Sequence, residues 1–189
     1  MKKLAIATLI LGAMSTSAFA ADAGMGKISF NGSIITSPCS IAPGNEEQNI
    51  PLGQVSNVTL ENGGMSTPQP FSIKLDGCTL NATYKGTNDK GEEIDIPYNN
   101  TVSIQFNGTP WVNGSTNTGL IRLTGEGQGA GVKLMTPAGT KIDIGSTVTQ
   151  NFVQGDNELR FQAALQGIKG ATVTPGQFDA VTNFVLTYN

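Results

Sequence analysis

Apolar and polar residues alternate with a period of two along most of the chain. In the clearest run, Phe71, Ile73 and Leu75 fall on one face while serine, lysine and aspartate fall on the other. Side chains of a strand point alternately to opposite faces, so this pattern predicts strands with one buried face. Comparable runs lie at 33–41, 101–106, 119–123, 131–135, 141–144, 159–165 and 184–189. Together they predict eight to ten strands and about one short helical turn.

The composition narrows this prediction to one fold class. Glycine supplies 24 of the 189 residues, charged residues supply 13%, and no long stretch of helix-forming residues occurs. Many short strands joined by tight turns give such a composition, as in a β-sandwich. No internal repeat and no linker divides the chain, so we expect one all-β domain.

Residues 1–20 have the pattern of an export signal. Lys2 and Lys3 give a positive start, a run of apolar residues follows, and Ala18-Phe-Ala20 matches a cleavage site. The apolar run is too short to span about 30 Å of hydrocarbon, which argues against a membrane anchor. We therefore expect cleavage after the twentieth residue and export of the remaining chain.

The mature chain then begins with a short alternating arm, residues 21–32. Five of its residues share one face: Gly24, Gly26, Ile28, Phe30 and Gly32. Glycine weakens a strand unless another backbone or a tight wall must come close. At the other end of the chain, the alternating run 184–189 stops without a following turn. This combination predicts that the arm is a strand donated to a neighbouring copy, while 33–189 forms the domain.

The chain has two cysteines, Cys39 and Cys78. In an exported chain they are expected to pair as a disulfide. Closing a loop of about forty residues stabilises a folded domain by about 4 kcal/mol in the chain-entropy model. A zinc site is the competing interpretation, but the sequence has no histidine and two thiols supply half of a tetrahedral shell.

Charge and side-chain chemistry exclude several classes of function. Without Lys2 and Lys3 the net charge is 9 minus 14, or −5, and no basic patch is available for nucleic acid. The absence of histidine removes the usual general base, and no phosphate-binding glycine motif opens a helix. We therefore expect neither an enzyme nor a protein with a small-molecule cofactor.

The segment 84–100 carries several carboxylates, which raises the possibility of a calcium loop. Their spacing lacks the order of aspartate, asparagine and glycine that such loops require, so we expect a solvated loop instead. A secreted carbohydrate-binding β-sandwich is the alternative function. It needs an exposed aromatic platform, for which Trp111 and Tyr98 are the candidates.

Several motifs, taken in order along the chain, resemble one known family. They are the alternating arm Gly26–Gly32, Pro38-Cys39, Ile50-Pro-Leu52-Gly53, the run 71–78, Gly131-Val-Lys-Leu134, a penultimate Tyr188, and Gly176 at the fourteenth position from the end. The chain resembles pilus subunits of the chaperone–usher class, close to the type 1 and P pilins of Gram-negative bacteria. The resemblance covers nearly the whole mature chain.

The resemblance implies an immunoglobulin-like sandwich that lacks its last strand. A periplasmic chaperone would first fill the resulting groove, and after passage through an outer-membrane usher a neighbouring subunit's arm would replace it. The fibre would stand on the cell surface and support adhesion. The residues implied for the groove and for chaperone contact are Leu159, Phe161, Ala163, Leu165, Gly176, Phe184, Leu186 and Tyr188.

Overall fold

A computed structural model describes residues 26–188. The expected export signal and Gly24 lie outside the described residues. The chain divides into two units, residues 1–34 and Ile35–Asn189, and each is described by itself. In the first unit, residues 26–34 form no strand and every one of them is exposed.

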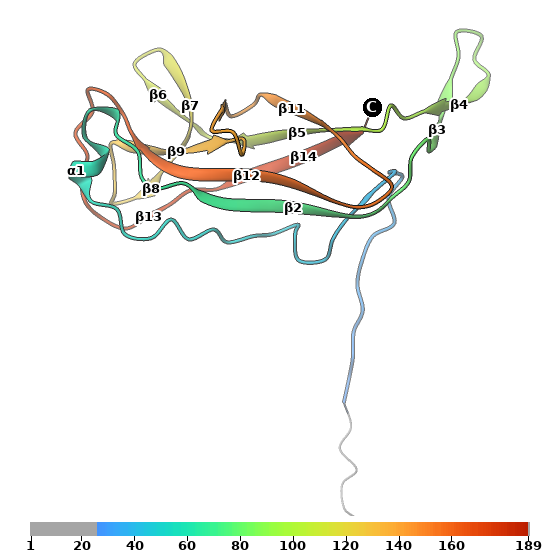
Figure 1. Cartoon of the computed structure of the whole chain (residues 1–189), viewed down its shortest axis with the longest axis horizontal. Coiled ribbons are helices and arrows are strands. Elements are labelled where there is room, and N and C mark those ends of the chain that lie inside the picture. The colour runs from blue at the N-terminus through green and yellow to red at the C-terminus, as the bar shows by residue number, and fades with distance from the viewer. Residues whose placement is uncertain (1–25, 189) are drawn as a thin grey trace, which may run out of the picture. The chain divides into compact units, whose positions relative to one another are not determined.

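The larger sheet of the second unit is antiparallel, in the order β1-β2-β12-β9-β7-β6, with β10 paired to β9 (Figure 1). Its strands are β1 (Ser40–Ile41), β2 (Gln69–Cys78), β6 (Pro110–Asn113), β7 (Thr116–Arg122), β9 (Ala130–Met135), β10 (Lys141–Ile142) and β12 (Gly155–Gly167). The register between its two longest strands pairs Leu159 with Ile73 and Phe161 with Phe71. The expected alternation at 71–75 and 159–165 therefore lies within paired strands of one sheet.

The second sheet has three strands in the order β11-β5-β14. They are β5 (Thr101–Gly108), β11 (Thr147–Asn151) and β14 (Thr182–Tyr188). Two further pairs complete the fold: β3 (Thr83–Thr87) with β4 (Glu93–Pro97), and β8 (Thr124–Gly125) with β13 (Phe178–Asp179). The helical part is one turn of α-helix, α1 (Asn57–Leu60), continued by a 3₁₀ turn, Glu61–Gly63. The expected all-β fold is confirmed.

The core lies between the two sheets and contains side chains from both. Ile73, Phe106 and Phe161 are each at most 2% exposed. The rings of Phe106 and Phe161 meet edge to face with their centroids 5.2 Å apart, a favourable geometry for aromatic pairs. The alternation seen in the sequence thus has its expected cause in these strands: β2, β5 and β12 each turn one face to this common core.

A disulfide joins Cys39 and Cys78, as expected. Both cysteines are buried, and the bond connects the start of the domain to the end of β2. The adjacent backbone is paired as well, since the amide of Thr79 donates to the carbonyl of Pro38 at 2.8 Å. The first residues of the domain are therefore fixed to one end of the larger sheet.

The strand expected over 33–41 is wrong in extent, because only Ser40–Ile41 pairs with β2. Pro38 has no amide hydrogen to donate, which prevents regular pairing before Cys39. After Ile41, the amide of Asn45 donates to the carbonyl of Ala42 at 3.0 Å, and this turn ends the strand.

The segment 84–100 is largely exposed to solvent, as expected, but it forms the β3–β4 hairpin and not an irregular loop. Its turn is closed by the amide of Gly91, which donates to the carbonyl of Asn88 at 2.9 Å. Gly91 has a φ of +79°, a conformation that glycine adopts without steric cost. The charged residues of the segment lie on the hairpin rather than in an irregular loop.

Candidate functional site

A groove of about 1120 Å³ opens between two segments of the domain, residues 46–55 and 176–184. Apolar side chains of five strands form its floor, and these strands come from both sheets. The residues of the floor are Phe71, Ile73, Phe106, Ile121, Val132, Leu134 and Ala163. The floor of the groove is therefore formed by residues of the apolar core, and the groove leads from the surface to them.

One wall of the groove is the segment 46–55, which forms no helix or strand. Its start is fixed to the edge of β2 by side chains: the amide of Gln48 donates to the carbonyl of Ser72 at 2.9 Å, and Asn45 accepts from the amide of Lys74 at 3.1 Å. These contacts hold the wall beside the larger sheet without using the backbone of residues 49–55. A strand lying in the groove could therefore contact this wall without displacing a strand that is already paired in a sheet.

The other wall begins at Gly176 and continues into β14, the edge strand of the smaller sheet. This strand pairs with β5 from Thr182, opposite Gly108, to Tyr188, opposite Val102. Within residues 26–188, no strand pairs with its other edge. Every second residue of an edge strand directs its amide and carbonyl away from the sheet, so this edge presents a row of free backbone partners.

The side chains of β14 alternate in the same way as the sequence predicts. Phe184, Leu186 and Tyr188 are half-buried against the core, whereas Val185 is 51% exposed. A complete sandwich would cover such residues with a further strand. The unpaired edge and the incompletely covered apolar face therefore belong to the same strand.

Of the eight residues implied for the groove, the structure places three in its lining: Ala163, Gly176 and Phe184. Leu159, Phe161 and Leu165 are buried in β12 as core residues. Leu186 and Tyr188 pack against the core from the far end of β14. The sequence reasoning missed most of the floor and the wall 46–55. The alternation of Ile50 and Leu52 was the available signal for that wall.

Gly176 lies where two loops approach each other closely. A Cβ atom at this position would be 2.6 Å from the Cβ of Glu126 and 2.7 Å from the amide nitrogen of Gly127. Backbone bonds hold the two loops in this position, since the amides of Glu126 and Gly127 both donate to the carbonyl of Gln177. The absence of a side chain at Gly176 thus allows the groove wall to pack against the glycine-rich loop.

Tyr188 closes the other end of β14. Its ring meets that of Phe152 edge to face, with centroids 6.1 Å apart. Burial raises the pKa of the Tyr188 hydroxyl, and a smaller opposing effect comes from a hydrogen bond with Ser37. The bonds of Thr79 to Pro38 and of Asn81 to Asn100, together with the pairing of Tyr188 opposite Val102, place the start of the domain beside this end of the edge strand.

The described part of the arm carries large apolar side chains that are exposed. Ile28 and Phe30 are 79% and 91% exposed, and apart from the adjacent residues no described atom lies within 4 Å of a Cβ position built on Gly26 or Gly32. In an extended conformation Gly26, Ile28, Phe30 and Gly32 share one face. Residues 26–32 also equal β14 in length, which has seven residues.

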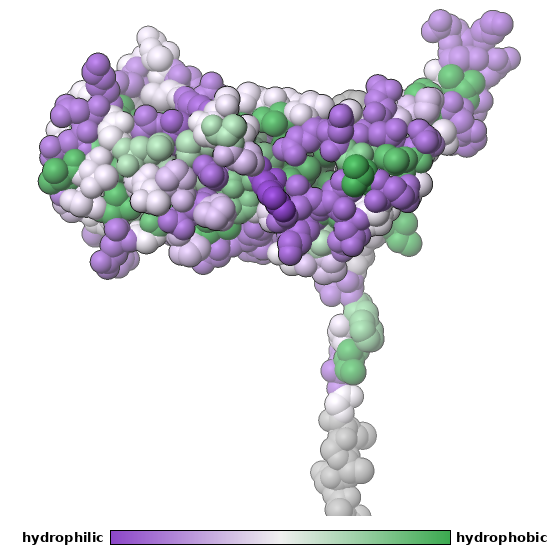
Figure 2. Space-filling model, viewed as in Figure 1, coloured by the Kyte–Doolittle hydropathy of each residue, from purple (hydrophilic) through white to green (hydrophobic). Residues whose placement is uncertain are grey.

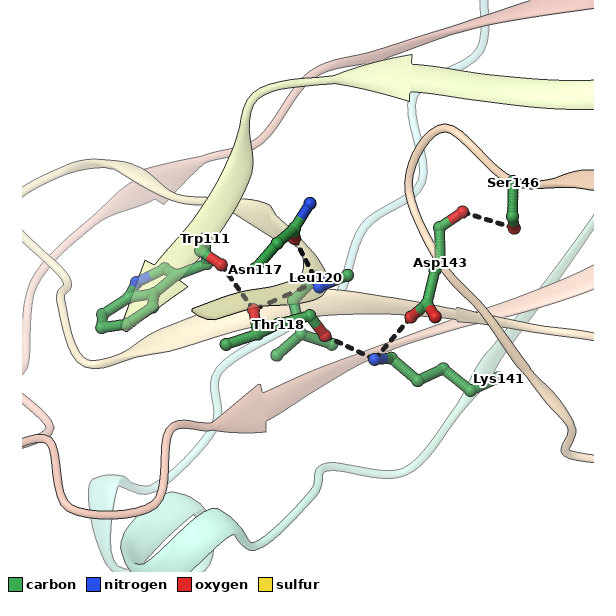
Figure 3. Close-up of polar contacts among 8 residues, drawn as sticks. Trp111, Asn117, Thr118, Leu120, Lys141, Asp143 and Ser146 are labelled. Atoms are coloured by element: carbon green, nitrogen blue, oxygen red, sulfur yellow. Dashed lines mark hydrogen bonds and ion pairs between the residues drawn. The ribbon is translucent and has the colours of Figure 1, made fainter. Parts of the chain in front are cut away.

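The aromatic residues considered for carbohydrate binding lie on different hairpins. Trp111 is in β6, and its carbonyl accepts a hydrogen bond from the hydroxyl of Thr118 at 2.7 Å (Figure 3). The ring of Tyr98 lies 5.0 Å from that of Tyr84. Both Trp111 and Tyr98 are half-buried, so they do not form one exposed platform.

The polar cluster beside Trp111 has a structural role. The ammonium of Lys141 contacts the carbonyl of Thr118 and pairs with the carboxylate of Asp143 at 2.6 Å (Figure 3). The hydroxyl of Ser146 donates to the carbonyl of Asp143. These contacts connect β7 to β10 and to the loop that follows it. Within the described part of the chain, no three histidine, cysteine or acidic side chains group as a metal site.

Comparisons with known proteins agree with this architecture. Residues 28–189 match the family model of the fimbrial protein. The chain is 40% identical to the Fimbria A protein of Serratia marcescens, covering all of this chain and 98% of that protein. It is 37% identical to the major MR/P fimbria protein of Proteus mirabilis, again over all of this chain and 98% of the relative.

Solved structures have the same fold. The P pilus rod subunit PapA superposes with a TM-score of 0.63 at 30% identity, over 81% of this chain and all of PapA. A subunit of a chaperone–usher pilus studied for the uncoiling of its rod superposes with a TM-score of 0.69 at 30% identity, over 88% of this chain and 97% of the pilus chain. The open, all-β sandwich with its groove is thus the immunoglobulin-like fold of pilus subunits.

The chain belongs to the fimbrial protein family. It is a structural subunit of a cell-surface fimbria and not an enzyme. None of the described helices is long and apolar enough to cross a membrane.

Proposed function

We propose that this subunit polymerises by donor-strand exchange, in which its arm, residues 21–32, enters the groove of a neighbouring subunit. The single observation that carries the proposal is that, among the described residues, no strand pairs with the outer edge of β14, which borders a groove floored by core residues. Such an edge pairs readily with an added strand. Pairing would satisfy its free backbone groups and cover the apolar floor.

The chemistry of the arm supports this assignment. Ile28 and Phe30 would each contribute about 1.5–3 kcal/mol on full burial, before the cost of ordering the arm. Gly26 and Gly32 share their face and allow close approach where the groove is tight. With seven residues from Gly26 to Gly32, the arm can pair along the whole of β14.

The direction of the arm follows from where the domain begins. Pro38 is hydrogen-bonded to Thr79, the nearby Asn81 is bonded to Asn100 just before β5, and Val102 of β5 pairs with Tyr188, so the domain begins at the C-terminal end of β14. If an incoming arm ran parallel to β14, its C-terminal end would also lie at the C-terminal end of β14. The neighbouring domain, attached to that end of the arm, would then lie against the point where the subunit's own arm departs. An antiparallel arm ends near Thr182 instead, at the opposite end. The antiparallel arrangement gives a head-to-tail chain in which every subunit both donates and accepts.

Before assembly, the groove must be shielded from water and from other chains. A core open to water and a free strand edge favour aggregation. A periplasmic chaperone that adds its own strand to β14 would protect the subunit until an outer-membrane usher brings the next arm to it. The completed fibre would then support adhesion of the cell.

A peptide-binding experiment tests the proposal. The domain lacking residues 21–32 is released from its chaperone and mixed with a synthetic peptide of that segment. A ligand that binds only the folded state raises stability in proportion to RT ln(1 + [L]/Kd), so melting should shift upward with peptide concentration.

The control peptide carries Gly26→Leu, which adds a side chain on the face that enters the groove. We expect it to shift melting much less than the natural sequence does. An unchanged melting temperature with the natural peptide would overturn the proposal, and so would equal shifts with the two peptides.

A further inference from the structure

The β3–β4 hairpin has two chemically different faces. Pairing of Tyr84 with Ile96 and of Gly86 with Ile94 places these residues on one face, and pairing of Ala82 with Tyr98 extends it. Cross-strand partners share a face of an antiparallel pair. This apolar face of the hairpin thus consists of Ala82, Tyr84, Gly86, Ile94, Ile96 and Tyr98.

The opposite face of the hairpin is polar and internally satisfied. Lys85 pairs with Asp95 at 3.0 Å and with Glu93 at 3.6 Å. Thr83 and Thr87 lie on the same face and are exposed. Because it carries three charged side chains and two exposed threonines, this face is suited to water.

The apolar face is only partly covered by the domain. Tyr84 remains 37% exposed and Ile94 39% exposed, although the rings of Tyr84 and Tyr98 contact each other in a tilted arrangement. Within the described chain, neither β3 nor β4 pairs with any further strand. Figure 1 shows the hairpin extending beyond the ends of β5 and β14, and Figure 2 shows apolar atoms among the polar ones on it. A two-stranded hairpin gains little stability by itself, so an uncovered apolar face on it points to a partner.

The base of the hairpin adjoins the point from which the arm departs. The disulfide fixes Cys39 to Cys78, and the amide of Asn81 donates to the side-chain oxygen of Asn100 at the hairpin base. Between the alternating arm and Pro38 there are five residues, 33–37. Five residues span at most about 18 Å. The five-residue strands of the hairpin are about 17 Å long, so the hairpin is long enough to reach a domain attached through this linker.

We propose that the apolar face of the β3–β4 hairpin packs against the neighbouring copy of this chain that receives the arm. This inference rests on the proposed donor-strand function, which sets the second copy within reach. A small apolar contact suffices there, because two tethered domains meet at a high effective concentration. With an antiparallel arm, the contacted region is the end of the neighbour near Thr182, which includes β6, β8 and β13.

Photo-crosslinking in assembled fibres tests this contact. Benzoylphenylalanine replaces Ile94 on the apolar face in one variant and Thr87 on the polar face in the control. The two positions lie on adjacent cross-strand pairs of the same hairpin, so they differ mainly in the face that they occupy. We expect the Ile94 variant to give at least a several-fold higher yield of covalent dimer, attached within residues 108–127 or 172–182 of the second copy.

Equal dimer yields from the two positions would overturn the inference, and so would crosslinks within a single chain. Attachment to the exposed face of β11 and β5 would also overturn it, because that result would indicate a lateral neighbour instead. The donor-strand proposal is tested separately, because these fibres keep the natural arm. If the arm were not the donor, the peptide experiment would fail whatever the hairpin contacts. If only the hairpin inference is wrong, peptide binding is unaffected.

Discussion

Gly26 alternates with Ile28 and Phe30 on the arm face proposed to enter the groove, and it contributes no side chain there. A Gly26→Leu change would force extra atoms into a packed site, which costs about 1–3 kcal/mol or more. The donating domain should fold normally, because residues 26–34 form no strand in it. We therefore expect shorter fibres and an accumulation of subunit–chaperone complexes, measured by electron microscopy and by fractionation of the periplasm.

The matched control is Lys27→Leu, which adds the same side chain on the opposite face of the arm. It should leave fibre length close to that of the natural protein. Normal fibres from the Gly26→Leu subunit would show that the register of the arm, or its role as donor, is wrong.

Tyr188 gives a pH-dependent prediction. Burial raises the pKa of its hydroxyl above the ordinary value of 10.0, so folding favours the neutral form. That contribution is fully present below pH 10 and is lost as the pH rises through the higher pKa of the folded state. With the arm peptide bound, urea midpoints should fall above pH 10, and Tyr188→Phe should flatten that fall. Parallel pH profiles for the two proteins would argue against the buried hydroxyl as the cause.

At the scale of elements, the disulfide fixes the start of the domain to the end of β2. Replacing both cysteines, Cys39→Ser with Cys78→Ser, restores the freedom of a loop whose ends are 39 residues apart. The chain-entropy model gives a loss of about 4 kcal/mol, a large share of the stability of one domain. Urea unfolding with bound arm peptide should show a clearly lower midpoint, and Ser40→Ala should have little effect. An unchanged midpoint would mean that the bond is not a major source of stability.

The elements differ in how far the sequence predicts them. Strands with regular alternation, such as those containing Ile73, Phe161 and Leu186, were predictable because one buried face leaves a period of two. The β3–β4 hairpin was not, since charges on its polar face obscured the alternation of Ile94 and Ile96. The strand at 33–41 was overestimated because apolar residues there occur without regular pairing.

The groove could be predicted only in part. Phe184 and Ala163 were expected at the site because they lie in the last strands, and they line it. Ile121 and Val132 also line it, but their alternation in β7 and β9 is that of any core residue. Whether a core side chain is open to a groove depends on which neighbouring strand is missing. That property belongs to the topology of the whole sandwich, so no local pattern reveals it.

At the scale of the whole molecule, the account describes a sandwich completed by another chain. Within residues 26–188 no strand pairs with the outer edge of β14, a groove lined by core residues lies beside it, and an arm of matching length carries exposed apolar side chains. Each subunit would thus be stable only with a strand that it does not supply to itself. Fibre growth follows directly, because every acceptor also carries a donor arm.

The most direct test supplies the missing strand within one chain. Residues 21–32 are moved from the N-terminus to follow Asn189 through a four-residue flexible linker, so that the arm can turn back antiparallel to β14. The account predicts a soluble monomer that needs no chaperone, binds no free arm peptide, and unfolds at a far higher guanidinium concentration than the arm-deleted domain. The same protein with Gly26→Leu in the moved arm should lose most of this gain. A moved arm that leaves stability and peptide binding unchanged would contradict the account.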